Sequence, residues 1–231
     1  MQGLSFIRSS LIYLFGSGIN GVLPLLFLPI LTRYLTPTDY GIVATSLVLV
    51  NMLTLFVGFN TSGLIAQSHF AGDSNSHQRL VSTNINTAGV ITAILLILLT
   101  ILKYPISEAI KFPPMWVPLM AIIALFSVIQ SIYFVILQIR EEPKKFVVLQ
   151  LLFTGLNFAI AIILIVGMGF DWRGRMLATI ISGIIITVIC IYSLNHQLGL
   201  FRLAFYKSSF RKLLSFGIPL VPHFIGGWVM T

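Results

Sequence analysis

Seven long stretches of the sequence contain no Asp, Glu, Lys or Arg, and they constrain the fold more than any other feature. They cover residues 9–32, 40–72, 80–102, 112–139, 146–170, 176–201 and 213–231. A helix needs about 20 mostly apolar residues to cross roughly 30 Å of hydrocarbon, so each of the first six can span a bilayer. Backbone polar groups in lipid must be satisfied within the segment, which favours helices. We therefore expect an all-α, polytopic membrane helical bundle with six complete transmembrane helices and the start of a seventh.

The scarcity of charge excludes a soluble fold. Only 9% of the residues are charged and the mean hydropathy is +1.00, whereas about a quarter of the residues of soluble domains are charged. The net charge is +8, but the basic residues stand in small groups between apolar runs, so nucleic acid is not an expected partner. Because the sequence has no Gly-rich phosphate loop and no nucleophile elbow, and its histidines lack metal-ligand spacing, we expect neither a cofactor nor a metal site.

The distribution of basic residues predicts the orientation in the membrane. If the N-terminus lies inside, nine Lys and Arg fall on the inner side and five on the outer side. Inner loops of membrane proteins are enriched in these residues, so we expect a multi-pass protein with a cytoplasmic N-terminus. The last inner loop, about residues 195–212, is the longest and most basic.

The sequence also indicates a division of the chain. We expect an N-terminal six-helix transmembrane lobe at residues 1–201, followed at 202–231 by a basic cytoplasmic linker and the start of helix 7. The last apolar run has no polar exit, so we expect a truncated form of a longer protein. Phe216-Gly217 before a Pro-containing helix mirrors Phe15-Gly16, about 200 residues earlier. A repeat of that size suggests two parallel bundles of six helices.

The most distinctive stretch is Pro29-Ile30-Leu31-Thr32-Arg33-Tyr34-Leu35-Thr36-Pro37-Thr38-Asp39-Tyr40-Gly41. It resembles the end of helix 1 in polysaccharide flippases of the Wzx type, where a Pro-x-Leu-Thr-Arg-x-Leu-Gly-Pro-x-x-Tyr-Gly pattern joins the first two helices. Thr36 stands where that family most often has Gly. Residues 174–176 and 216–220 also resemble the family. The chain is thus similar to the N-terminal half of a member of the multidrug, oligosaccharidyl-lipid and polysaccharide exporter superfamily, whose members have twelve or more helices.

This resemblance implies a transporter and not an enzyme. The implied cargo is an undecaprenyl-diphosphate-linked oligosaccharide, an O-antigen or capsule repeat unit, moved across the bacterial inner membrane for lipopolysaccharide or capsule biosynthesis. The implied partners are this lipid-linked oligosaccharide, membrane lipids, a polysaccharide polymerase and a chain-length regulator. The sugar and the pyrophosphate would occupy a polar cavity between two six-helix lobes while the polyprenyl tail stays in lipid.

Other functions stay open on the sequence alone. A MATE-like drug or ion exporter of the same superfamily would share the helix count, but the six acidic residues lie in or beside predicted loops, and cation relays usually need a carboxylate within the membrane. A membrane polysaccharide-assembly enzyme would need a large external loop carrying active residues, and no external loop here is that long. A scaffold without transport activity is also open for half a chain.

Arg33 and Arg175 are the candidates for binding an anionic cargo. An arginine pairs in bidentate fashion with phosphate oxygens such as those of a pyrophosphate. Thr179 and Ser182 follow Arg175 at i+4 and i+7, so the three residues share one helical face. For each arginine the alternative is an interfacial anchor, whose long stem carries the charge to the lipid headgroups.

Uncharged polar residues recur at helical spacing and supply further candidates for a cavity. Gln150 and Asn157 share a face of the fifth helix with Thr154, and Asn20 belongs to a polar group in the first helix. Such residues should point away from lipid, either as hydrogen bonds that pack helices together or as the lining of a hydrated path. Both interpretations stay open.

Two prolines, Pro24 and Pro29, lie within the first apolar run. Proline removes a backbone donor and permits a kink. A bent first helix would be a candidate gating element, and a static kink is the alternative.

Overall fold

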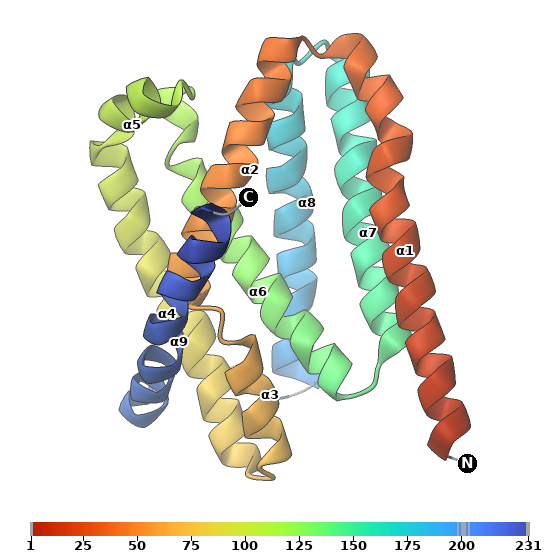
Figure 1. The fold of residues 1–231 in the computed structure, drawn as a ribbon, viewed down its shortest axis with the longest axis vertical. Coiled ribbons are helices and arrows are strands. Elements are labelled where there is room, and N and C mark those ends of the chain that lie inside the picture. Colours follow the sequence, from red (N-terminus) through yellow and green to blue (C-terminus); the bar gives the residue numbers. More distant parts are fainter. Residues whose placement is uncertain (1, 198, 200–201, 203, 230–231) are drawn as a thin grey trace. The chain divides into compact units, whose positions relative to one another are not determined.

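The part of the chain that the structure describes consists of helices and their connections. A computed structural model describes residues 2–197, 199, 202 and 204–229. The protein is 87% helical, and the described residues form no strand. The helices are α1 (Gln2–Tyr34), α2 (Pro37–Gly58), α3 (Ser62–Phe70), α4 (Ser74–Ile101), α5 (Lys103–Ile110), α6 (Leu119–Ile139), α7 (Pro143–Ile162), α8 (Trp172–Tyr192) and α9 (Lys207–Val229) (Figure 1). A 3-10 turn, η1 (Pro114–Trp116), precedes α6, and π-helical turns η2 (Ile163–Gly167) and η3 (Ser193–Gln197) extend α7 and α8.

Six segments among the described residues are long and apolar enough to cross a membrane. They are Ser10–Tyr34, Pro37–Phe70, Ser74–Ile101, Pro114–Ile139, Pro143–Gly167 and Trp172–His196. Each coincides with one of the first six charge-free runs, so the prediction of an all-α polytopic bundle is confirmed. Helix α9 begins at Lys207 and supplies the start of the seventh helix.

The start of α2 shows how local sequence sets a helix boundary. The backbone N–H and the hydroxyl of Thr36 donate to Oδ2 of Asp39 at 2.8 and 2.7 Å, and the Asp39 N–H donates back to the Thr36 hydroxyl at 3.2 Å. This reciprocal pattern satisfies donors at a helix start that otherwise have no partner. Pro37 occupies the first helical position, where a missing N–H does no harm. The buried Asp39 carboxylate therefore serves as a hydrogen-bond acceptor at the start of α2.

The second apolar run is not one continuous helix. Helix α2 ends at Gly58 and α3 begins at Ser62. Phe59 and Asn60, between them, have φ values of +48° and +46°, a left-handed conformation that interrupts the right-handed helix. The run contains no proline that would announce the break, and it was not expected from the sequence.

The chain folds into two compact units. The first contains Met1–Ala44 and Ile136–Ile186, and the second contains Thr45–Val135 and Thr187–Thr231. The chain passes from one unit to the other within α2, α6 and α8. The expected division at residue 201 concerns the lobes of a longer transporter, and it stays a prediction.

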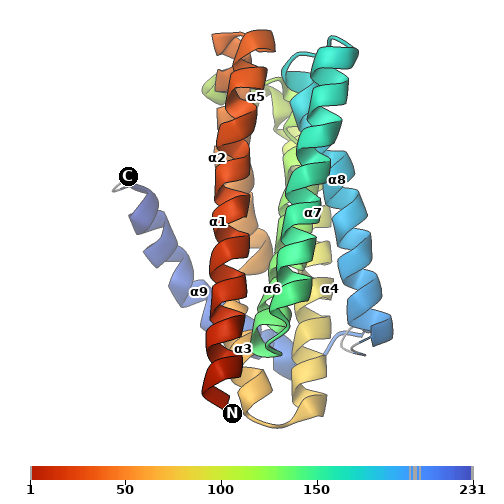
Figure 2. The same cartoon turned by 90° about the vertical axis from the view of Figure 1, so that its right-hand side faces the viewer.

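In the first unit, α1 packs along α7 (Figures 1 and 2). Gly16 allows the close approach, because a Cβ at this position would lie 2.6 Å from Cγ1 of Val147. Further along the two helices, the rings of Phe27 and Phe158 stack with their centroids 4.2 Å apart. The contact continues to a buried cluster that contains Leu31, Leu35, Phe158, Ala161, Ile165 and Ala178.

In the second unit, the connection between η3 and α9 is held along α4. Asn86 donates to the carbonyl oxygens of Arg202 and Ala204 at 3.0 and 2.9 Å. The Ser82 hydroxyl accepts a hydrogen bond from the backbone N–H of Arg202 at 3.0 Å. The Thr83 hydroxyl accepts one from the backbone N–H of Tyr206 at 3.4 Å. The side chains of α4 thus hold the backbone of Arg202, Ala204 and Tyr206 before α9.

Candidate functional site

The sequence candidates on α7 and α8 come together in one polar cluster within the first unit. Arg175 Nη1 donates a hydrogen bond to Oδ1 of Asn157. The Asn157 amide nitrogen donates to the hydroxyls of Thr179 and Ser182, at 3.3 and 3.0 Å. Asn157 is 6% exposed and Ser182 is fully buried. The predicted shared face of Arg175, Thr179 and Ser182 is therefore observed, and it is turned toward α7. We call these four residues the Arg175 cluster.

The backbone of α8 fixes the two hydroxyls of this cluster. The Thr179 hydroxyl donates to the carbonyl of Arg175 at 3.1 Å, and the Ser182 hydroxyl donates to the carbonyl of Ala178 at 2.7 Å. Each hydroxyl can therefore present its oxygen to Asn157 as an acceptor. The Asn157 oxygen accepts from Arg175 and its nitrogen donates to Thr179 and Ser182, so the orientation of the amide is fixed. Hydrogen bonds within the protein therefore define the geometry of the cluster.

An aromatic surface supports the Arg175 guanidinium. Its Cζ lies 5.0 Å from the centroid of the Phe158 ring, within the range of a cation–π interaction. Phe158 in turn stacks on Phe27 of α1. Tyr40 packs against the same buried cluster, and its hydroxyl is buried without a hydrogen-bond partner among the described residues. The site thus joins α1, α2, α7 and α8.

The distinctive motif at residues 29–41 packs against the helices that carry this site. Leu31 and Leu35 are buried in the cluster that contains Phe158 and Ala178, and Tyr40 packs against it. The motif residues therefore support the helix that carries Arg175. Leu31 and Leu35 contribute packing around the cation, since their side chains are apolar.

The charge of Arg175 has no carboxylate partner among the described residues. Among the described residues, ion pairs join Glu142 to Arg140 at 3.6 Å and to Lys145 at 2.6 Å. Arg175 lies in the first turn of α8, where the helix dipole adds positive potential and further disfavours a lone cation. A half-buried arginine within a membrane span, with no carboxylate beside it, has charge and hydrogen-bond donors to offer an anion, and substrate binding by Arg175 stays a prediction.

The remaining polar candidates lie on the contact between α1 and α7. The Thr154 hydroxyl donates to Oδ1 of Asn20 at 2.5 Å, so these two residues join the helices. Gln150 lies one turn before Thr154, and its side-chain oxygen is buried without a partner among the described residues. The predicted polar face on α7 is present. Thr154 of this face bonds to Asn20 of α1, whereas Asn157 belongs to the Arg175 cluster.

Arg33, Pro24 and Pro29 lie outside the Arg175 cluster. Arg33 is exposed in the last turn of α1. Both prolines are exposed, and α1 runs without interruption through them from Gln2 to Tyr34. Substrate binding by Arg33 and gating by the prolines stay predictions.

The sequence did not point to Phe158 or Phe27, and it marked Tyr40 only as a member of the motif at residues 29–41. Aromatic residues are frequent in this chain, and no spacing distinguishes the two phenylalanines. Their role depends on the register between α7 and α8 and on the close approach of α1, which only the structure supplies.

Comparison with known proteins identifies the family. A sequence model described as "Polysaccharide biosynthesis protein" matches residues 6–231. The chain belongs to this family. "Lsg locus putative protein 1" of Haemophilus influenzae is 25% identical over 224 residues, which cover 94% of this chain and 52% of that protein. The chain therefore spans about half the length of the curated relatives it matches.

Solved structures of transporters share the fold. An outward-facing multidrug resistance MATE family transporter of the MOP superfamily has a TM-score of 0.71 at 19% identity, covering 94% of this chain and 51% of that one. A MOP superfamily transporter from Pyrococcus furiosus has a TM-score of 0.71 at 18% identity, with the same coverage. This member of the polysaccharide biosynthesis family thus has the fold of about half of such a transporter.

Proposed function

We propose that this chain is part of a flippase that moves an undecaprenyl-diphosphate-linked oligosaccharide, an O-antigen or capsule repeat unit, across the bacterial inner membrane. The family and the fold support a membrane protein of polysaccharide biosynthesis with a transporter architecture. The observation that carries the finer proposal is Arg175, a half-buried cation with no carboxylate partner among the described residues. In this proposal the N-terminus lies in the cytoplasm and the protein is not an enzyme.

The Arg175 cluster can bind the diphosphate group of such a cargo. A guanidinium has five N–H donors in a planar fork, and the bond to Asn157 uses one of them. The other donors suit the oxygens of a phosphate, with which arginine forms bidentate pairs. The Phe158 ring packs against the guanidinium, with its centroid 5.0 Å from Cζ.

The energetic task of the protein is to lower the barrier for a charged, hydroxylated headgroup. Each polar group that enters hydrocarbon without a partner costs several kcal/mol. A fixed cation offsets the charge, and hydroxyl and amide groups replace water. Rocking of two lobes around the bound headgroup would then expose it to the other side. A polysaccharide polymerase and a chain-length regulator are the partners proposed downstream.

A drug or ion exporter is the second candidate, because the solved structures that share the fold include a multidrug resistance transporter. Exporters driven by cations usually use an intramembrane carboxylate. Asp39 is the buried carboxylate among the described residues, and Thr36 engages it at the start of α2. Loss of transport in Asp39→Asn, with the helix still formed, would favour this second function.

The test of the flippase proposal is the delivery of lipid-linked sugar in cells that make the full-length protein. Arg175→Ala should lower surface polysaccharide at least tenfold while the protein is inserted normally. Arg173→Ala is the matched control, since this neighbouring arginine is exposed and lies over the Trp172 ring at 5.6 Å. An unchanged polysaccharide level in Arg175→Ala, with normal expression, would count against the proposal.

A further inference from the structure

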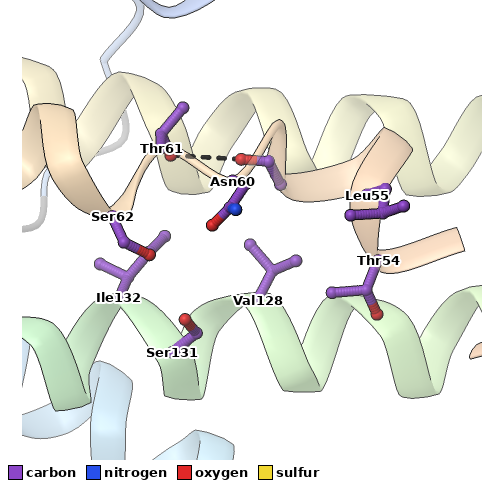
Figure 3. A pocket seen from close by; sticks show the side chains of 9 residues that line it. Thr54, Leu55, Asn60, Thr61, Ser62, Val128, Ser131 and Ile132 are labelled. Atoms are coloured by element: carbon purple, nitrogen blue, oxygen red, sulfur yellow. Dashed lines mark hydrogen bonds between the residues drawn. The ribbon is translucent and has the colours of Figure 1, made fainter. Parts of the chain in front are cut away.

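A second polar site lies in the other compact unit, at the break between α2 and α3. It is a cavity of about 180 Å³ between this break and α6 (Figure 3). Its lining consists of Thr54, Leu55, Gly58, Asn60, Thr61, Ser62, Val128, Ser131 and Ile132. The Arg175 cluster shares no residue with it.

The break creates this cavity, and its walls are held in place. Gly58 lets α6 approach, because a Cβ there would lie 2.8 Å from Cγ2 of Val128. The Thr61 hydroxyl donates to the carbonyl of Gly58 at 3.2 Å and accepts from the amide of the buried Asn84 at 2.5 Å. Phe59 and Asn60 have a left-handed backbone, which for a bulky residue such as phenylalanine is a strained conformation of the kind that clusters at binding sites. A membrane helix interrupted in this way presents polar backbone and side-chain groups to a cavity.

The lining suits a neutral, hydroxylated ligand. Its polar side chains are hydroxyls and one amide, which both donate and accept hydrogen bonds, and the nine lining residues carry no formal charge. Asn60 and Ser131 are exposed, and Figure 3 shows them pointing toward one another across the cavity. Polar groups in an apolar span avoid lipid and face either neighbouring helices or a hydrated path. Divalent cations favour sites with carboxylates, which this lining lacks.

The size of the cavity fits one sugar ring. A cavity of about 150 Å³ holds benzene in an engineered protein, so a slightly larger one with polar walls can hold a hydroxylated six-membered ring. Leu55, Val128 and Ile132 offer apolar contact to the C–H face of such a ring, while the amide and hydroxyls contact its edge. Binding sites with mostly apolar walls and a few placed polar groups are typical for small ligands.

We propose that this cavity, called here the α2–α3 site, binds one uncharged sugar ring of the cargo. The inference rests on the proposed function, which it deepens by assigning the sugar contacts. Helix α2 has 22 residues and therefore rises about 33 Å, enough for one full crossing. With a cytoplasmic N-terminus, the α2–α3 site then lies near the inner face of the membrane, where lipid-linked sugars are loaded.

The test is binding of free sugars to the purified full chain in nanodiscs, measured by saturation-transfer NMR. The probes are the methyl glycosides of glucose, galactose and N-acetylglucosamine. Asn60→Gly removes the amide and keeps a residue that accepts positive φ, and it is combined with Ser131→Ala. Thr100→Ala is the control, because this exposed hydroxyl of α4 donates to its own helix at Leu96.

We expect the unsubstituted chain and the Thr100 variant to bind at least one glycoside, and the double variant to bind it at least tenfold more weakly. Absence of binding by the unsubstituted chain, or equal binding by the double variant, would overturn the α2–α3 site. Circular dichroism and gel filtration check that each variant is folded.

Delivery of lipid-linked sugar in cells separates this inference from the proposed function. If only the α2–α3 site is wrong, the double variant delivers normally and Arg175→Ala still fails. If the flippase function is wrong, a null strain and the Arg175 variant show normal polysaccharide, whereas the glycoside measurement still reports on the α2–α3 site.

Discussion

Arg175 of α8 donates a hydrogen bond to the side-chain oxygen of Asn157 of α7, and this bond links a half-buried cation to a neutral side chain. Because Asn157 gives its nitrogen to Thr179 and Ser182, one amide holds three partners. The position of the guanidinium therefore depends on a neutral residue, which leaves its charge available to a ligand.

Replacing Asn157 by aspartate should separate the charge of the site from its packing. In Asn157→Asp, a carboxylate meets the guanidinium and neutralises it, so delivery of lipid-linked sugar should fall at least tenfold. The ion pair should keep the protein folded, with a midpoint of unfolding in detergent close to that of the unsubstituted chain. Asn157→Ala is the comparison, since it removes the partner of Arg175 and should destabilise the chain by about 1–3 kcal/mol. Normal delivery by the folded aspartate variant would contradict an anion-binding role.

The hydrogen bond between Thr154 and Asn20 should contribute measurably to the contact of α1 with α7. Thr154→Val keeps the shape and removes the hydroxyl, and we expect a loss of about 0.6–1.7 kcal/mol, as found for interhelical hydrogen bonds in membranes. Titration with a denaturing detergent measures this change. Thr100→Val serves as the control, since its hydroxyl bonds only within α4. Equal effects of the two substitutions would show that Thr154 makes no special contribution.

A pair of substitutions, at Gly16 and at Val147, should reveal the close approach of α1 to α7. Gly16→Ala places a methyl group against Val147, and overpacking of this kind costs about 1–3 kcal/mol. Adding Val147→Ala should restore much of the lost stability, because it removes the atoms in conflict. A double-mutant cycle measures this coupling, and strictly additive losses would contradict the direct contact.

The connection before α9 should become accessible when its anchor on α4 is removed. Asn86→Ala removes both hydrogen bonds to the carbonyls of Arg202 and Ala204. We expect trypsin to cleave after the exposed Arg202 several times faster in this variant, since proteases need a locally released backbone. Gln67→Ala is the control, because this side chain is exposed on α3. An unchanged cleavage rate would mean that other contacts suffice to hold the connection.

The sequence predicted the membrane spans well because hydrocarbon imposes a simple rule. Runs without charge mark the six crossings, and the structure places a helix on each. The break after Gly58 was not predicted, since it involves the contact of Gly58 with Val128 of a helix far along the sequence and a positive φ at Phe59, which such a residue usually avoids.

The candidate site was predicted in part. Spacing along α8 correctly placed Arg175, Thr179 and Ser182 on one face, because helical periodicity is a local property. Asn157 was predicted from the polar face that it shares with Gln150 and Thr154. Its position opposite Arg175, however, follows from the register between α7 and α8. Arg33 shares the residue type of Arg175 and not its surroundings, since it is exposed at the end of α1.

The unpaired charge of Arg175 also affects how the protein is made. An arginine adds up to about 2.5–3.5 kcal/mol to the free energy of insertion through the translocon, and less near the end of a span, whereas each Leu, Ile, Phe or Val contributes about −0.3 to −0.6 kcal/mol. The span Trp172–His196 is rich in isoleucine, so its apolar side chains offset the arginine. The translocon can therefore insert α8 without help from a neighbouring helix, and the newly made protein holds its cation in the membrane before it meets any anion.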